Sequence, residues 1–153
     1  MRTDVILYGL KSKSTWRLFF FGFITLGIYD VYYIALQTNI LNRHLRREER
    51  LSKTFINLIF AVNAIAAALL LASFLDRGEE FRQIKLLSSI LYQAWWILVT
   101  IWTFLARSRM NLLLSAKRRK VLWFHGAWTF LFSFFYFNFK INKLNKTLFH
   151  RPY

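Results

Sequence analysis

Two long stretches of the chain carry no charged side chain. Thr54–Leu75 spans 22 residues and Leu86–Ala106 spans 21. About 20 helical residues, at about 1.5 Å per residue, cover the roughly 30 Å hydrocarbon core of a lipid bilayer. The pattern therefore predicts two membrane-spanning helices, at about residues 54–75 and 86–106.

Two further apolar stretches differ from ordinary spanning helices. Leu18–Leu41 contains Asp30 and is interrupted by Gly27, and Val121–Phe139 contains His125 and a glycine next to it. A charge at the middle of a bilayer costs about 2.5–3.5 kcal/mol, and a glycine eases a bend of the backbone. We therefore expect two bent re-entrant or interfacial segments, at about residues 18–41 and 121–139, that flank the spanning helices. The predicted fold is an all-α integral membrane protein with a single domain, residues 1–153.

The two bent segments share a short pattern: a threonine, a tyrosine seven residues later, and then Asn-x-Leu-Asn. The residues are Thr25, Tyr32, Asn39 and Asn42 in the first segment, and Thr129, Tyr136, Asn142 and Asn145 in the second. The match needs one residue of slippage between the tyrosine and the first asparagine. It is either a weak internal repeat, which would imply two related halves, or a coincidence in an aromatic sequence.

The distribution of basic residues favours the bent layout. The chain has 22 Lys or Arg against 7 Asp or Glu, for a net charge of +15. Only three of the basic residues lie in Asp76–Lys85, and the other polar segments hold 4, 5, 6 and 4 along the chain. Four full crossings would place 11 on each side, whereas two crossings place 19 on one side and 3 on the other. Because cytoplasmic loops are enriched in Lys and Arg, we expect both termini in the cytoplasm and only Asp76–Lys85 outside.

Small and amide side chains indicate where the spanning helices touch other helices. Ala64, Ala68 and Ala72 recur every four residues, a spacing that lets another helix approach closely, although alanines also face lipid. Asn63 and Gln93 are expected to bond across a helix interface, or else to line a pore. Trp102 suits a membrane interface, at the end of its segment.

Basic clusters beside apolar segments predict contact with anionic lipid headgroups rather than with nucleic acid, because they flank membrane segments instead of covering one face of a soluble domain. The residues are Arg43, Arg46, Arg47, Arg50, Lys117, Arg118, Arg119 and Lys120. The first cluster reads as a solvated extension of the preceding helix, in which i, i+4 pairs add support.

The sequence offers little catalytic chemistry. It has no cysteine, and the three histidines are His44, His125 and His150. Only His125 lies in an apolar segment, so a pair of haem ligands at matching depth is lacking. No nucleophile, metal-binding or phosphate-binding motif is present. We therefore expect no enzyme activity, no metal and no cofactor.

Residues Trp16–Asn42 resemble the bacterial and archaeal membrane family named domain of unknown function 4234. The features that carry the resemblance are Trp16-Arg17, Thr25-Leu26-Gly27-Ile28-Tyr29, Tyr32-Tyr33 and Asn39-Ile40-Leu41-Asn42. A Tyr-Trp pair is more usual in the family than Tyr32-Tyr33. The resemblance implies a small helical protein of a prokaryotic inner membrane, and it implies no catalytic residues.

Three functions remain open from the sequence. The first is a non-catalytic structural or accessory subunit of a larger membrane assembly, in contact with anionic lipids. The second is a homo-oligomeric channel or transporter-like protein with Asp30, Asn63 and Gln93 near its axis. The third, a membrane enzyme or electron carrier that uses His125, has the least support because no partner ligand is evident.

Overall fold

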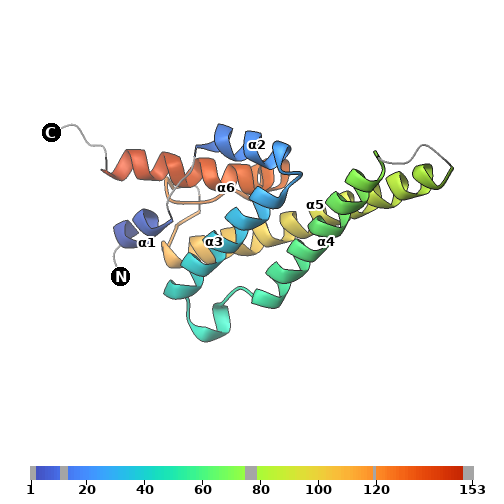
Figure 1. The fold of residues 1–153 in the computed structure, drawn as a ribbon. Helices are drawn as coiled ribbons and strands as arrows, with labels where there is room; N and C mark the ends of the chain where they lie inside the picture. Colours follow the sequence, from blue (N-terminus) through green and yellow to red (C-terminus); the bar gives the residue numbers. More distant parts are fainter. Residues whose placement is uncertain (1–2, 11–13, 75–78, 119, 150–153) are drawn as a thin grey trace.

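The structure is a computed structural model that describes residues 3–10, 14–74, 79–118 and 120–149. These residues form an all-α fold of six helices (Figure 1). In chain order they are α1 (Thr3–Gly9), α2 (Thr15–Ile24), α3 (Ile28–His44), α4 (Lys53–Ala72), α5 (Glu79–Leu113) and α6 (Gly126–Phe149), with a short 3-10 turn at Arg47–Glu49.

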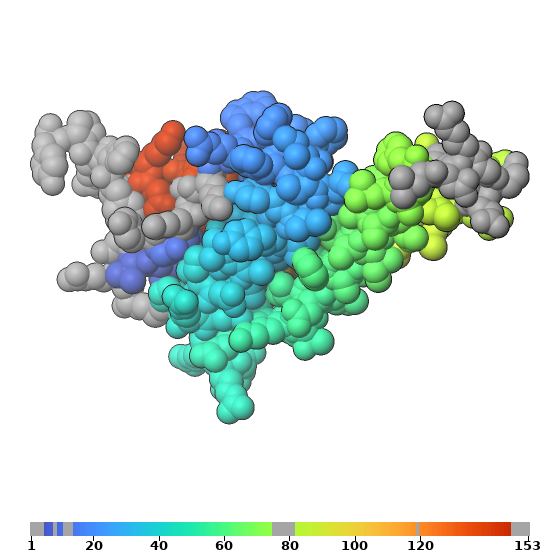
Figure 2. Space-filling model, viewed as in Figure 1, coloured from blue at the N-terminus to red at the C-terminus, as the bar shows by residue number. Residues whose placement is uncertain are grey.

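The two uncharged stretches form α4 and α5, which pack side by side as an antiparallel pair. The Ser52 hydroxyl caps α4 by accepting a hydrogen bond from the Phe55 N–H, and the Ser88 hydroxyl donates to the Ala66 carbonyl at 2.9 Å. Both helices are long and apolar enough to cross a membrane. Figure 2 shows them extending beyond the rest of the molecule, with their connected ends farthest from the other helices. The predicted pair of long apolar helices is confirmed.

The first bent segment consists of α2 and α3, joined by a sharp break. Leu26 and Gly27 take left-handed backbone conformations, with φ of 52° and 89°. The Thr25 hydroxyl donates to the Phe21 carbonyl and accepts from the Tyr29 N–H, and so ties the break to both helices. The sequence thus predicted this bend at the right residue, Gly27.

Two side chains of the long pair hold this break in place. The Leu26 carbonyl has no partner in α2 or α3, and it accepts from Asn63 Nδ2 at 3.0 Å and from the Tyr92 hydroxyl at 3.3 Å. A Cβ atom at position 27 would lie 2.6 Å from Asn63 Nδ2 and 3.1 Å from the Trp95 ring, so the backbone approaches α4 and α5 closely there. Since Asn63 is near the middle of α4, the break lies about halfway along the pair.

The second bent segment is α6, which turns at Ser133. That residue has φ of 45° and ψ of −134°, and its hydroxyl lies 3.1 Å from the Thr103 hydroxyl of α5. The helix begins at Gly126, so the first five residues of the predicted segment belong to the connection before it. The two segments share a helix–break–helix shape, but the break follows Thr25 by one residue and Thr129 by four, so the proposed residue-by-residue repeat does not describe the breaks.

Both bent segments return to the end of the molecule where they start. On the outward limb of α6, the preceding Phe124 carbonyl accepts from Arg107 Nε at 2.7 Å, and on the return limb Lys140 Nζ donates to the Val121 carbonyl at 2.7 Å. At the far end of α3, Ile40 contacts Gly9 of α1. Figure 1 shows α1, the end of α3 and the last turns of α6 on one side of the molecule, and the joined ends of α4 and α5 on the other.

Polar links and stacked rings fill the space between the bent segments and α5. The Tyr33 hydroxyl donates to Asn138 Oδ1 at 3.1 Å, and Asn138 Nδ2 donates to the Thr15 hydroxyl at 3.0 Å, so one amide joins α2, α3 and α6. Trp102 is fully buried and donates from Nε1 to the Thr38 hydroxyl at 2.9 Å. The expectation that Trp102 lies at a membrane interface was wrong, because α3 and α6 cover this part of α5.

The basic stretch after α3 is not a helical extension, contrary to the expectation. The helix ends at His44, where Leu45 adopts an extended conformation, and the chain then forms the turn at Arg47–Glu49. The reason is a tether to the next helix: Asn42 binds both backbone groups of Leu51. The chain must turn back within a few residues to make this contact.

The amide of Asn63 yields a test of the first break. We expect Asn63→Leu to lower the free energy of unfolding by about 1–3 kcal/mol, because the partly buried Leu26 carbonyl loses its shorter hydrogen bond. Thermal unfolding in mild detergent measures this change. Asn57→Leu, on the exposed face of the same helix, is the matched control and should leave the midpoint unchanged or raise it. Equal effects of the two substitutions would contradict the role given to Asn63.

Candidate functional site

The candidate site lies at one end of the molecule, where two basic connections meet. Because α4 and α5 are antiparallel, the connections that leave α3 and α5 lie at the same end, which we call the basic end (residues 43–53 and 107–120). All of the predicted headgroup residues that the structure describes are exposed there: Arg43, Arg46, Arg47, Arg50, Lys117, Arg118 and Lys120. Arg119 lies outside the described residues.

Each connection is tied back by an asparagine on the helix that precedes it. Asn42 Nδ2 donates to the Leu51 carbonyl at 2.9 Å, and Asn42 Oδ1 accepts from the Leu51 N–H at 2.8 Å. Asn111 does the same to Phe124, with an Oδ1 contact of 2.8 Å and an Nδ2 contact of 3.3 Å. In both cases the residue that the asparagine binds lies two positions before the first residue of the next helix. The amides therefore fix where α4 and α6 start and hold the basic residues at the surface.

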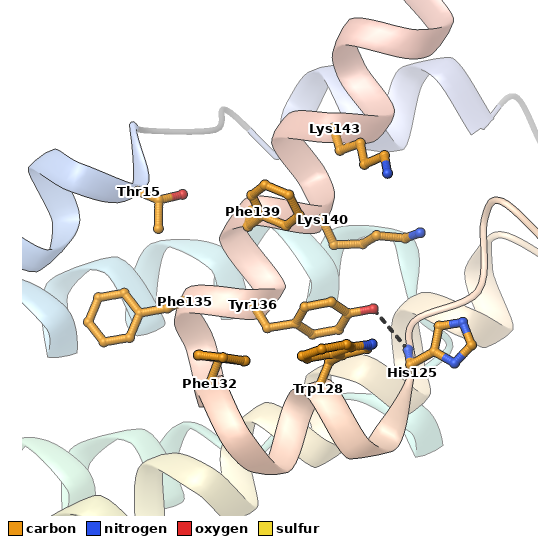
Figure 3. Close-up of a pocket in the computed structure, with 9 residues that line it drawn as sticks. All are labelled: Thr15, His125, Trp128, Phe132, Phe135, Tyr136, Phe139, Lys140 and Lys143. Carbon is orange, nitrogen blue, oxygen red and sulfur yellow. Dashed lines mark hydrogen bonds between the residues drawn. The ribbon is translucent and has the colours of Figure 1, made fainter.

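A pocket of about 540 Å³ opens between the two limbs of α6 and the start of α2 (Figure 3). Five of its nine lining residues are aromatic: Trp128, Phe132, Phe135, Tyr136 and Phe139. Trp128 and Phe132 stack at 5.8 Å between ring centroids, with an interplanar angle of 22°. The Tyr136 hydroxyl accepts a hydrogen bond of 3.1 Å from the His125 N–H, which closes the pocket against the start of α6.

The pocket is positively charged on one side. Lys140 and Lys143 line it beside His125, and no carboxylate is among the lining residues. Figure 3 shows both lysines on the return limb of α6, away from the Trp128 and Phe132 rings that lie before the kink. Burial, and after it the charge of Lys143, lowers the pKa of the Lys140 ammonium group. This arrangement can take up an anion that carries an apolar tail.

The residues predicted to mediate helix packing differ in their burial and contacts. Asn63 is buried and bonds across a helix interface, as expected, but Gln93 is exposed. Ala68 and Ala72 are exposed and Ala64 is partly buried, whereas Ala66 and Ala67 are buried on the face that packs within the chain. The predicted face of Ala64, Ala68 and Ala72 is therefore not the main contact inside this molecule, where the carbonyl of the buried Ala66 accepts from Ser88 of α5.

The residues that carried the family resemblance have distinct structural roles. Thr25 and Gly27 form the first break, and Asn42 holds the connection to α4. The Tyr29 ring contacts the Phe21 ring at 5.3 Å between centroids, whereas Tyr32 and Asn39 are exposed.

One carboxyl group is buried near the first break. Asp30 is 5% exposed, its Oδ1 has no hydrogen-bond partner among the described residues, and a Cβ at position 22 would overlap with its carboxylate. The amide of Gln37, two turns farther along α3, is also buried without a partner among these residues. Within the described part of the chain, no three His, Asp or Glu side chains form a group that could hold a metal ion.

Sequence reasoning missed Asn111, Lys140 and Lys143. An asparagine in the last turn of a helix before a basic connection was a usable signal for Asn111, because Asn42 stands in the same position. Lys140 and Lys143 follow the apolar segment in the sequence, and only the kink at Ser133 brings them over the aromatic rings of the same helix.

Comparison with known families gives one match. The model of a family described as Domain of unknown function (DUF4234) matches residues 13–112, which run from before α2 to the last turn of α5. The likeness therefore includes both long helices as well as the first bent segment, whereas α6 lies outside it. Comparisons with curated proteins and with solved structures give no match.

The asparagine tethers yield a second test. We expect Asn42→Ala and Asn111→Ala each to lower the unfolding free energy by about 1–3 kcal/mol, because a buried backbone group loses its partner. Amide hydrogen exchange should speed up at Leu51 in the first variant and at Phe124 in the second. Asn39→Ala, an exposed position on α3, should change neither quantity. Unchanged exchange at Leu51 in Asn42→Ala would rule out the tether.

Proposed function

We propose that the chain, which belongs to the DUF4234 family, acts as a non-catalytic accessory subunit of a larger membrane protein assembly. In this role it also contacts anionic lipids. The observation that carries the proposal is the exposed apolar surface of the long pair. Only 28% of the most apolar 18-residue stretch of α4, and 17% of that of α5, is buried inside the molecule. Apolar patches of this size on a folded protein need lipid or another protein to cover them.

The proposed placement has α4 and α5 crossing the bilayer and both bent segments entering it from the basic end. The first break contacts Trp95, which stands 12 residues before Arg107, or about 18 Å along a helix. A bend at that depth lies near the middle of a roughly 30 Å core. The 19 Lys and Arg outside Asp76–Lys85 favour the cytoplasmic side for the basic end and both termini, and the resemblance suggests a prokaryotic inner membrane.

The exposed cations of the basic end support the contact with anionic lipids. Eight Lys or Arg side chains of the basic end are exposed among the described residues: Arg43, Arg46, Arg47, Arg50, Lys53, Lys117, Arg118 and Lys120. The tethers of Asn42 and Asn111 hold the two connections in place. A basic residue near an anionic leaflet contributes about 1 kcal/mol of attraction. The contribution falls with rising salt concentration, because these charges are screened.

Exposed aromatic side chains support the role of a subunit. Many of them lie on α2 and on the first limb of α6: Trp16, Phe19, Phe20, Phe23, Trp128, Phe130 and Phe132. Rings supply large contact areas at little entropic cost and are enriched at protein interfaces. On α4, the exposed Ala68 and Ala72 leave room for another helix to approach.

A homo-oligomeric channel or transporter-like protein is the second candidate. The buried Asp30 favours it, because an ionisable group inside a membrane protein usually serves an ion or substrate path. The other residues of that hypothesis support it less: Gln93 is exposed, and the Asn63 amide is bonded to the Leu26 carbonyl. We therefore favour the accessory subunit.

Purification in mild detergent, followed by mass determination, separates the two candidates. We expect a foreign membrane protein to co-purify with the chain at a fixed ratio. A single species that contains several copies of this chain and nothing else would contradict the accessory role and favour the channel.

Ala68 offers a specific test of the outer face of α4. We expect Ala68→Leu to reduce the mass of the purified assembly while the chain keeps its unfolding midpoint, because the residue is exposed and a larger side chain blocks close approach of a neighbour. Ala66→Leu is the contrasting variant: it should lower the midpoint, because Ala66 is fully buried. An unchanged assembly in Ala68→Leu would mean that this face contacts lipid.

A further inference from the structure

The pocket within α6 combines a cationic side with an aromatic side. At about 540 Å³ it falls within the roughly 300–1,000 Å³ range of small-molecule sites. Its cationic side, with Lys140 and Lys143, faces the basic end. Lys140 Nζ donates to the Val121 carbonyl, which lies in the segment between α5 and α6. Its aromatic side lies toward the Ser133 kink, and hence toward the bilayer interior in the proposed placement (Figure 3).

The lysines lack a negative partner in the pocket. No carboxylate lines it, and Lys140 Nζ donates its hydrogen bond to a neutral carbonyl oxygen, that of Val121. Two ammonium groups three residues apart on one helix repel each other, and the partial burial of Lys140 adds a desolvation cost. An anion placed between them would remove both costs, and phosphate oxygens accept the short charge-assisted hydrogen bonds that lysines donate.

We propose that this pocket binds one anionic phospholipid, whose phosphate lies between Lys140 and Lys143 and one of whose two acyl chains runs along the aromatic side past Phe135 to Phe132. The proposal rests on the membrane placement given above, which sets the lysines at headgroup depth and the rings below them. The site is distinct from the exposed arginines and lysines of the two connections, because its lysines lie on α6 and line a pocket together with five aromatic side chains.

A lipid fits the pocket better than a free phosphate ion. Five of the nine lining side chains are aromatic, and a small anion would contact only the lysine side and leave these rings uncovered. Burial of apolar surface contributes about 25 cal/mol per Å², so the acyl chain supplies a large share of the affinity. The negative headgroup in turn distinguishes the ligand from a zwitterionic lipid of the same chain length.

Native mass spectrometry of the full chain in mild detergent tests the proposal. The probes are dioleoyl phosphatidylglycerol and dioleoyl phosphatidylcholine, which share their acyl chains. We expect one phosphatidylglycerol to be retained per chain, and phosphatidylcholine to be retained at least several-fold less. Lys143→Gln should reduce the retained phosphatidylglycerol roughly fivefold, as expected for one basic contact, and Lys143→Arg should restore it.

Lys146→Gln is the matched control, because Lys146 is an exposed lysine on the same limb of α6 and does not line the pocket. It should keep the single bound lipid. Lys143 is exposed, so its variants are expected to fold, whereas Lys140→Gln also removes the contact to Val121 and serves only as a supporting variant.

Three results would overturn the proposal: equal retention of the two lipids, equal losses in Lys143→Gln and Lys146→Gln, or displacement of the lipid by excess inorganic phosphate alone. The last result would mean that only the headgroup is bound. The accessory role is tested by co-purification, and the proposed topology is tested by labelling from outside the cell. A failure of either can therefore be distinguished from a failure of lipid binding.

Discussion

The carbonyl group of Leu26 imposes the constraint on which this fold depends. A helix satisfies its own backbone, but a break inside an apolar region frees polar groups that have no water to bond, and each unpaired group costs several kcal/mol. Here the freed carbonyl accepts from Asn63 of α4 and Tyr92 of α5. The bend is thereby fixed against both long helices, at about half their length. If it were held at another depth, α3 would not place Thr38 opposite Trp102.

The same solution recurs at three other places where the described chain leaves regular helix. Asn42 and Asn111 each satisfy both backbone groups of a residue ahead of a new helix, and Ser133 at the second kink pairs with Thr103. Amide and hydroxyl side chains, rather than ion pairs, hold the molecule together in the contacts described. Such bonds contribute roughly 0.6–2 kcal/mol each between membrane helices, and two or three per break suffice to fix a shape. They leave the cations of the basic end available for headgroups.

The sequence predicted the long helices and the existence of both bends, because charge-free length and interruptions such as Gly27 and Asp30 are local signals. It placed the second bend poorly, since Ser133 is compatible with a helix and its partner Thr103 lies 30 residues away. The alanine spacing marks a face of α4 but does not say whether that face meets α5 or another molecule, and within this chain Ala66 rather than Ala68 is buried. The pocket was invisible, because Lys143 reaches the aromatic rings only after α6 has turned.

In the proposed topology, both bent segments enter and leave the bilayer on one side. Cysteine labelling is the most direct measurement of this topology. The chain has no native cysteine, so single substitutions can be treated with a membrane-impermeant maleimide in intact cells, with permeabilised cells as the control in which all sites react. The positions are Ser14, Ser52, Gly78, Ser115 and Thr147. We expect labelling from outside at position 78 alone. Labelling at 52 and 115 but not at 78, or labelling at 14 and 147 together with 78, would mean that both bent segments cross the membrane and would contradict this topology.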